Sequence, residues 1–360
     1  MKRLKKHFKN SHILIVGSGI IGKFNALELC EQGFQITIAD PQKSKNSSSA
    51  ALGLLISNMY QKSKGRSWEL RKKSFGLWPK WIKFLQQYNK NLNIEKPLIQ
   101  LTTDKKKFEK LNKLISDNTD RDLKVLEKDS TIIKKINKIF DIKDLRGIIS
   151  FEDGRIDPIS LLKTLDIYLK TKNVNFINEE VTKINKKNNQ WFSKCKNKLE
   201  IKSDAIILCN SLDALKLIDS NRHNIKLKPV LGQAIEITID EKEISLLSLP
   251  KHFSINGKNF LPINKNKLII GSTDEYDITP KENTFDELTN FLETKPIWLN
   301  KNKITNKWYG IRSQPVGEPS PILKSLENGL ILCTGFYKNG ILLAPACSNW
   351  ISNEIKKHLA

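Results

Sequence analysis

The sequence contains few of the residues that mark disulfide-rich, metal-binding or membrane-spanning proteins. Its five Cys form no Cys-x-x-Cys pair, and its five His form no His-x-x-x-His pair. We therefore expect reduced thiols and no metal site. No apolar run reaches the roughly 18 residues of a membrane span. The basic residues 1–10 precede an apolar run that is too short for a signal peptide, so we predict a cytoplasmic protein without a cleaved leader.

Arginine is also scarce for so basic a chain. The formal net charge is +23, yet only eight of the 61 basic residues are Arg, and the Lys are scattered along the whole chain. Lys-rich surfaces raise non-specific binding to polyanions. Since no zinc-finger spacing or aromatic RNA-binding motif accompanies the charge, we interpret it as a compositional bias and expect no specific nucleic-acid partner.

The N-terminal segment has the pattern of a dinucleotide-binding β-α-β unit. Residues 12–16 are a continuous apolar run, which is typical of a buried strand. Gly-Ser-Gly-Ile-Ile-Gly follows at 17–22, and apolar residues then recur at helical spacing up to Gly33. A second strand over 35–39 ends at Asp40. Because strand, glycine turn, helix, strand and acid come in this order, we predict that the unit binds a dinucleotide.

Each glycine of this turn has a separate expected role. Gly17 permits the tight change from strand to helix, Gly19 leaves room for a pyrophosphate, and Gly22 lets helix and strand approach closely. The N–H groups and the positive dipole end of the helix would bind the phosphates. Asp40 could accept hydrogen bonds from the adenosine ribose, and its charge argues against a 2′-phosphate, so FAD or NAD is favoured over NADP.

Beyond this unit the patterns predict a mixture of helices and antiparallel strands. Aromatic residues recur at roughly helical spacing over 61–90, which indicates a core helix. Asp157 is a predicted N-cap with Pro158 at the first helical position. Alternating apolar residues over 229–239 predict a long half-buried strand, and 284–287 has the pattern of a capping box. Antiparallel strands with a helix would form a layer separate from the β-α-β unit.

Several motifs together resemble those of one flavoprotein family. In chain order they are the glycine turn with Asp40, SSSAALGLL, DGRIDPISLLKTL, PVLGQAIEI, KLIIGSTDEYD, WYGIRSQP and TGFYKNGILLAPA. In this order they resemble the D-amino-acid oxidase family, and most of all its glycine oxidase branch, which is associated with thiamine biosynthesis. The resemblance extends over nearly the whole chain and is weakest over 90–145.

The resemblance implies an α/β fold with a Rossmann-like FAD-binding domain and an inserted α+β substrate domain built on an antiparallel sheet. The FAD-binding domain would be discontinuous and would follow a basic N-terminal extension at 1–10. Its expected segments are 11–80, 146–225 and 305–360, and the expected segments of the substrate or cap domain are 81–145 and 226–304. The resemblance leaves a homo-oligomer open.

The cofactor that the resemblance implies is non-covalent FAD. The implied contacts are Gly17, Gly19, Ile20, Ile21, Gly22 and Asp40 in the N-terminal unit, Ser48, Ser49, Ala50 and Gly53 along the isoalloxazine, Val181 at the adenine through its backbone, and Gly335, Asn339, Gly340 and Ile341 beside the flavin ring. The Asn339-Gly340 turn and the helix start after it would present backbone N–H groups to the pyrimidine end of the ring. No Cys lies in the turn after Arg312, so a covalent flavin is not indicated.

The resemblance also implies a substrate site with three candidate catalytic residues, Arg312, Lys338 and Tyr337. Arg312 would bind the substrate carboxylate, since a planar guanidinium can pair with it through two parallel hydrogen bonds. The alternative is a structural Arg paired with Glu318. Lys338 stands where glycine oxidases often have a second Arg, and it either assists carboxylate binding or is a solvated Lys at a turn. Tyr337 and Tyr309 are candidate pocket hydroxyls.

Several positions depart from the family pattern, and three of them are single-residue replacements. Phe336 replaces a common His, Ser313 replaces a Pro, and Asn259 replaces a Tyr that often faces the substrate. These changes leave the expectation of FAD intact and leave the substrate open.

We therefore expect an FAD-dependent enzyme that oxidises a small amino acid or secondary amine, such as glycine, sarcosine or a D-amino acid, to the imine by hydride transfer to flavin. Oxygen or a quinone would accept the electrons. The cofactor supplies the difficult step, so little side-chain acid–base catalysis is needed. Two alternatives stay open: a flavin-binding protein whose amine oxidase activity has diverged or been lost, and a flavin domain acting on modified tRNA, which the net charge suggests.

Overall fold

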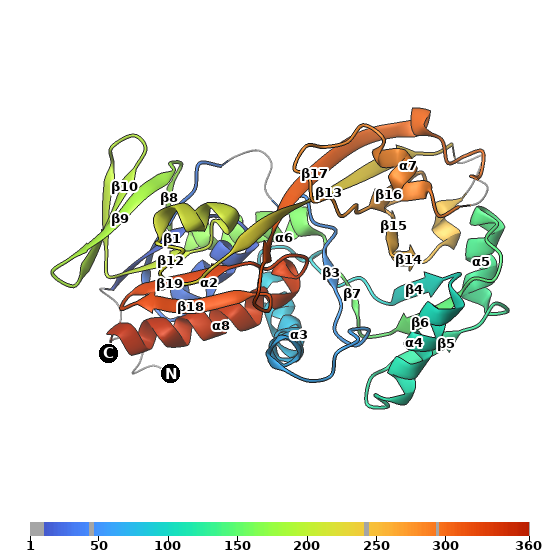
Figure 1. Cartoon of the computed structure of the whole chain (residues 1–360), viewed down its shortest axis with the longest axis horizontal. Helices are drawn as coiled ribbons and strands as arrows, with labels where there is room; N and C mark the ends of the chain where they lie inside the picture. Colours follow the sequence, from blue (N-terminus) through green and yellow to red (C-terminus); the bar gives the residue numbers. More distant parts are fainter. Residues whose placement is uncertain (1–10, 43–46, 241–244, 293–294, 360) are drawn as a thin grey trace.

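The computed structural model describes residues 11–42, 47–240, 245–292 and 295–359, so the predicted N-terminal extension at 1–10 lies outside the described residues. Figure 1 shows two parts side by side, one built on a six-stranded sheet and the other on an eight-stranded sheet. Helices and strands alternate in the first part, and nearly all neighbouring strands of the second are antiparallel. The predicted α/β fold class, with a second part on an antiparallel sheet, is confirmed.

The first part is a mostly parallel sheet in the order β18-β19-β12-β1-β2-β8, in which only β18 runs antiparallel to its neighbour. Its strands are β1 (His12–Val16), β2 (Gln35–Ala39), β8 (Asn175–Ile177), β12 (Ala205–Leu208), β18 (Ile322–Glu327) and β19 (Leu330–Thr334). Its helices are α2 (Ile20–Cys30), α3 (Arg66–Leu85), α6 (Pro158–Thr171) and α8 (Gly340–Leu359). Strands β1 and β2 have the predicted bounds.

Strand β1 is apolar throughout because both faces of its sheet are covered. Ile13 and Ile15 lie in the core cluster formed with α2, α3, α6 and α8. Leu14 and Val16 point the other way, into a cluster with the meander β9 (Val181–Lys187), β10 (Gln190–Cys195) and β11 (Glu200–Ser203). A strand covered on both sides reads as a continuous hydrophobic run, as the sequence indicated.

The second part is an eight-stranded sheet in the order β17-β13-β16-β15-β14-β4-β6-β5. Its strands are β4 (Leu98–Thr102), β5 (Leu123–Leu126), β6 (Arg146–Ser150), β13 (Leu227–Thr238), β14 (Phe253–Ile255), β15 (Lys258–Pro262), β16 (Lys267–Gly271) and β17 (Ile304–Pro315). Helices α4 (Lys105–Ser116), α5 (Thr131–Phe140) and α7 (Thr284–Thr289) belong to it, and Phe140, Phe253, Phe260 and Trp298 form an aromatic core between sheet and helices.

The long strands β13 and β17 bring the two parts together. They pair antiparallel along their lengths and extend from the second sheet toward the first (Figure 1). A short ribbon of β3 (Leu54–Leu55) with β7 (Gly154–Arg155) and three short helices, η1 (Ser211–Leu217), η2 (Leu246–Ser248) and η3 (Lys301–Lys303), complete the described elements. The cavity described below lies at the end of β13 and β17 nearest the first sheet.

The predicted domain division remains a prediction, and two of its boundaries fall beside strands of the eight-stranded sheet. The boundaries at 146 and 305 assign β6 and β17 to the FAD-binding segments, whereas both strands lie in the eight-stranded sheet. Sequence periodicity shows that a segment is a strand and does not show which sheet it joins.

Two local predictions are confirmed and one is wrong. The aromatic stripe belongs to the core, since Trp78 of α3 is fully buried against Phe24 of α2. The Asp157 carboxylate caps α6 by accepting a hydrogen bond from the Ser160 N–H at 2.7 Å. The capping box is wrong, because Thr284 lies inside the short helix α7 and its hydroxyl donates back to the Lys281 carbonyl at 2.8 Å. None of the helices in the described ranges has both the length and the apolar character that a membrane span requires.

Candidate active site

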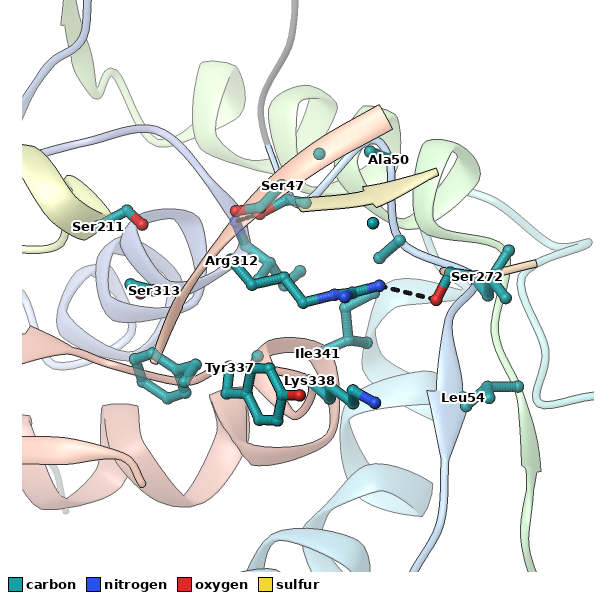
Figure 2. Close-up of a pocket in the computed structure, with 18 of the residues that line it drawn as sticks. Ser47, Ala50, Leu54, Ser211, Ser272, Arg312, Ser313, Tyr337, Lys338 and Ile341 are labelled. Atoms are coloured by element: carbon teal, nitrogen blue, oxygen red, sulfur yellow. Dashed lines mark hydrogen bonds between the residues drawn. The ribbon is translucent and has the colours of Figure 1, made fainter. Parts of the chain in front are cut away.

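A cavity of about 230 Å³ lies where the N-terminus of α2, the end of β19 and the β13–β17 pair meet. Figure 2 shows Ser47 and Ser211 on one side of it, with Arg312 extending across and Tyr337 and Lys338 on the other side. The lining residues that the sequence singled out are Ile20, Ile21, Ser48, Ala50, Gly53, Asn259, Arg312, Ser313, Phe336, Tyr337, Lys338, Gly340 and Ile341. Gly17, Gly19, Gly22, Asp40, Ser49, Val181, Gly335 and Asn339 are not among its lining residues.

The turn between β1 and α2 needs glycine for steric reasons. Gly17 has a φ of +106°, and a Cβ on it would lie 2.8 Å from the backbone of Cys209 on β12's end. A Cβ on Gly22 would lie 1.9 Å from the carbonyl oxygen of Gly17. The helix therefore starts in direct contact with the strand, as the roles expected for these two glycines require.

The start of α2 borders the cavity, because Ile20 and Ile21 are among its lining residues. Its first turn is Ile20-Ile21-Gly22-Lys23, and the Ser48 hydroxyl accepts a hydrogen bond from the Ile20 N–H at 3.0 Å. Oxygen Oδ2 of Asp40, at the end of β2, accepts from the Ser18 N–H at 2.7 Å. The Asp40 carboxylate thus contacts the chain two residues before the N-terminus of α2. A helix N-terminus beside a carboxylate suits a diphosphate joined to a ribose.

The C-terminal bend runs from β19 into α8. Its left-handed positions are Gly335, with a φ of 68°, and Tyr337, with a φ of 52°. The Tyr337 N–H donates to the Ser313 carbonyl at 2.9 Å, which fastens the bend to β17. Gly340 already begins α8, so the turn lies before the Asn339-Gly340 pair and the pair itself starts the helix.

Sequence reasoning missed Arg71, whose side chain is hydrogen-bonded to Asn339 at the end of this bend. Arg71 of α3 is 5% exposed, its Nη2 donates to the Asn339 side-chain oxygen at 2.8 Å, and its Nη1 donates to the Ile56 carbonyl. The guanidinium also lies 4.0 Å over the ring of Tyr60. Burial lowers its pKa from the usual value. In the sequence, only the scarcity of Arg in this Lys-rich chain could have drawn attention to Arg71.

Arg312 projects from β17 into the cavity and is held on three sides. Its Nη1 donates to the Thr273 carbonyl at 3.2 Å and to Asp274 at 2.8 Å, and its Nη2 donates to the Ser272 hydroxyl at 2.7 Å (Figure 2). Its side chain is 14% exposed. The alternative partner is wrong, because Glu318 pairs with Lys324 at 3.1 Å.

Gly232 and Asp274 are two further residues that the sequence did not reveal. A Cβ on Gly232 of β13 would lie only 2.0 Å from Nη2 of Arg312, so this glycine provides the space that the guanidinium occupies. The second oxygen of Asp274 accepts a hydrogen bond from Lys338 Nζ. Lys338 lies in the turn with 47% of its side chain exposed, as the alternative of a solvated Lys describes, and its Nζ also pairs with Asp274. Its assistance in carboxylate binding stays a prediction.

The other predicted residues lie around the cavity. Val181, at the start of β9, is buried in the same apolar cluster as Val16 and Ala39 at the ends of β1 and β2. Ser49 and Tyr309 line a neighbouring depression that shares Ala50 with the cavity.

A glycine turn before α2, an acid at the end of β2 and a cavity leading to a second sheet are the features of a two-part dinucleotide-binding protein. The family described as FAD dependent oxidoreductase (DAO) matches residues 12–354, and the chain belongs to this family. FAD is its cofactor, and the residues present fit it, because the turn has glycine at Gly17 and Gly22, where a Cβ would meet backbone, and the Asp40 carboxylate accepts a hydrogen bond from the Ser18 N–H of this turn.

The chain is similar to several characterised proteins. It is 25% identical over 353 residues to the bifunctional protein ThiO/ThiG of Synechocystis sp., a match that covers 96% of this chain and 51% of that protein. The chain therefore spans about half the length of this curated relative. Among solved structures it resembles glycine oxidase from Bacillus cereus, with a TM-score of 0.82, 20% identity, and coverage of 97% of this chain and 95% of that one. It also resembles iminodiacetate oxidase from Chelativorans sp., with a TM-score of 0.78, 17% identity, and coverage of 96% and 95%. The predicted resemblance to the D-amino-acid oxidase family is confirmed.

Proposed function

We propose that the protein oxidises a small amino acid or secondary amine, of the size of glycine, sarcosine or D-alanine, to the corresponding imine. The observation that supports this most is the position of Arg312, a largely buried guanidinium in a cavity bordered by the starts of both α2 and α8. FAD, when bound, accepts the hydride that leaves the substrate carbon. By analogy with the branch that the sequence resembles, we place this activity in thiamine biosynthesis, with oxygen or a quinone as the electron acceptor.

The side chains of the cavity would bind and orient the substrate. Arg312 would pair with its carboxylate, and the Ser272 hydroxyl and Thr273 carbonyl restrict the guanidinium to one orientation before the substrate arrives. Lys338 would add a second positive charge on the side of the C-terminal bend, and Tyr337 would supply a hydroxyl on the same wall. Such positioning converts a bimolecular encounter into an oriented complex, which is where the protein contributes most to this reaction.

For the cofactor, we propose the contacts that the sequence suggested. The glycine turn and Asp40 would hold the pyrophosphate and ribose, and Ser48, Ala50, Gly53 and Ile341, which line the cavity, would lie along the ring. The start of α8 at Gly340 would direct its N–H groups and dipole at the pyrimidine end of the ring, where they stabilise negative charge.

An Arg312→Ala variant tests the substrate role. We expect it to retain yellow, bound flavin but to lose rapid flavin reduction by glycine, sarcosine and D-alanine under anaerobic conditions. The loss should be about hundredfold or more, since two hydrogen bonds to a charged group contribute roughly 3 kcal/mol. Arg312→Lys should recover only part of the rate, because an ammonium cannot form the paired bonds.

The matched control is Arg222→Ala, which removes the same charge from an exposed side chain that pairs with Glu327 at 3.6 Å. The flavin of this variant should be reduced by the amines at the same rate as that of the parent. Equal reduction rates in Arg312→Ala and the parent would contradict the role of Arg312.

One observation favours a second candidate function, a flavoprotein that no longer oxidises small amino acids. Asp274 already pairs with both cations of the cavity, Arg312 and Lys338. The same anaerobic screen distinguishes the two. Bleaching of the flavin by any of the amines supports the oxidase, and a flavin that none of them bleaches supports the second candidate.

A further inference from the structure

Asp274 lies between the two cations of the cavity. One carboxylate oxygen accepts from Arg312 Nη1 at 2.8 Å, and the other accepts from Lys338 Nζ. The three side chains come from different segments: Arg312 from β17, Lys338 from the bend before α8, and Asp274 from the segment after β16. They therefore form a bridged trio of charges at the wall of the cavity.

The trio sets the charge of the cavity. Among the lining residues that the structure describes, Asp274, Arg312 and Lys338 are the charged ones, so the lining has a formal charge of +1. Arg312 is 14% exposed, whereas Asp274 and Lys338 are 40% and 47% exposed, so Arg312 lies deepest and the other two lie nearer the solvent. A ligand with one carboxylate neutralises the site. A second carboxylate would approach Asp274 and would meet a like charge there.

Asp274 also occupies one of the N–H donors of Arg312. Both N–H groups of Nη1 are directed at protein oxygens, those of Thr273 and Asp274, and Nη2 has one N–H toward Ser272. A guanidinium has five N–H donors, so Arg312 can still pair with one carboxylate. Lys338, the cation that could bind a second one, is already paired with Asp274.

We infer that Asp274 is a specificity-determining residue that restricts the site to substrates with a single carboxylate and excludes dicarboxylates. The inference rests on the proposed function, because it assumes that the cavity binds the substrate carboxylate. Repulsion of a wrong ligand by a fixed like charge is an established way to gain specificity.

The experiment compares two ligands that have no amine and so cannot be oxidised. Methoxyacetate has one carboxylate, and diglycolate has the same ether oxygen with a carboxylate on each side. Each is titrated into the FAD-loaded full-length protein, and the dissociation constant is read from the change in the visible flavin spectrum at constant ionic strength. The parent, Asp274→Asn and Asp277→Asn are compared. Asp277, an exposed residue of the same segment whose carboxylate accepts from the Thr279 N–H, controls for the change in net charge.

We expect the parent to bind methoxyacetate more tightly than diglycolate. In Asp274→Asn the ratio of the two dissociation constants should shift at least tenfold toward diglycolate, and in Asp277→Asn it should stay within twofold of the parent. An unchanged ratio in Asp274→Asn would overturn the inference, and so would the failure of both ligands to bind the parent. Flavin reduction by amines is measured separately. The titrations therefore test the role of Asp274 in selectivity, and the reduction experiment tests the oxidase activity.

A second variant guards against a folding defect in Asp274→Asn. Lys338→Gln leaves Asp274 and Arg312 as the charged lining residues and brings the formal charge of the described lining to zero. We expect its affinity for methoxyacetate to fall at least tenfold. An unchanged affinity would show that the charge of the trio does not control binding.

Discussion

Gly232→Ala should disable substrate binding while leaving the fold and the flavin in place. Gly232 is the residue of β13 that leaves room for the Arg312 guanidinium, and its added Cβ would lie 2.0 Å from Nη2 and 2.7 Å from Nη1. Ordinary contact begins at 3.4 Å, so the guanidinium must move by at least about 1.4 Å. The neighbours of the new methyl group are the end of a flexible side chain, which can move without displacing the backbone.

The size of the effect follows from the contacts that this movement breaks. A shift of that size removes the 2.7 Å bond to Ser272 and lengthens the 2.8 Å pair with Asp274. Hydrogen bonds to a charged group contribute roughly 1.5–3 kcal/mol each, and a misplacement of about 1 Å at a reacting site can cost about a hundredfold in rate. We therefore expect kcat/KM for the best amine to fall about a hundredfold, with a loss of at most about 1 kcal/mol in the free energy of unfolding.

The assay is anaerobic reduction of the bound flavin in a stopped-flow instrument, with urea unfolding measured in parallel. Gly76→Ala is the matched control, because it makes the same chemical change inside α3 at a position where a Cβ has nothing within 4 Å. It should leave reduction unchanged and stabilise the protein by roughly 0.5–1 kcal/mol. If the flavin of Gly232→Ala is reduced as fast as that of the parent, the placement of Arg312 against β13 is refuted. A variant that unfolds instead would show that the strands cannot accommodate the shift.

Two further predictions concern stability. Burial lowers the pKa of His252 to about 3 from 6.5, so the stability that neutral His252 contributes is complete above pH 6.5 and is about 2 kcal/mol smaller at pH 5. In His252→Gln the unfolding free energy should therefore fall by about 2 kcal/mol less between pH 7 and pH 5 than in the parent. The same pH dependence in both proteins would contradict this prediction. The buried carboxylate of Asp153 accepts hydrogen bonds at 2.7–2.9 Å from the N–H groups of Ser57, Asn58 and Met59. Asp153→Ala should therefore lower the unfolding free energy by about 3 kcal/mol in urea titrations, and Asp153→Asn by less; a loss below about 1 kcal/mol in the Ala variant would be inconsistent with these bonds.

The parts of the molecule that the sequence predicted well are those in which the determining contacts are local. The β1–α2–β2 unit closes within residues 12–40, and the close approach that requires Gly22 is to the Gly17 carbonyl, only five positions earlier in the chain. The cap of α6 likewise joins Asp157 to Ser160, three residues apart. The failed capping box shows the limit of the same reasoning, because the helix begins at Thr284 itself, so Thr284 is not the N-cap and its hydroxyl donates back to the Lys281 carbonyl.

The charges of the cavity could not be predicted in this way, because their partners are set by sheet pairing. Arg312 meets Asp274 across 38 positions, Lys338 meets Asp274 across 64, and Arg71 reaches Asn339 across 268. The sequence could identify Arg312 as unusual only through its scarcity and through resemblance, and both leave its partners open. Once β13 lies between β16 and β17, the end of β16 directs Ser272 and Asp274 at the guanidinium, with Gly232 leaving the space between them. The selectivity of the site therefore depends on the order of the strands β17-β13-β16, and a change in that order would separate Asp274 from Arg312 even if every motif in the sequence were retained.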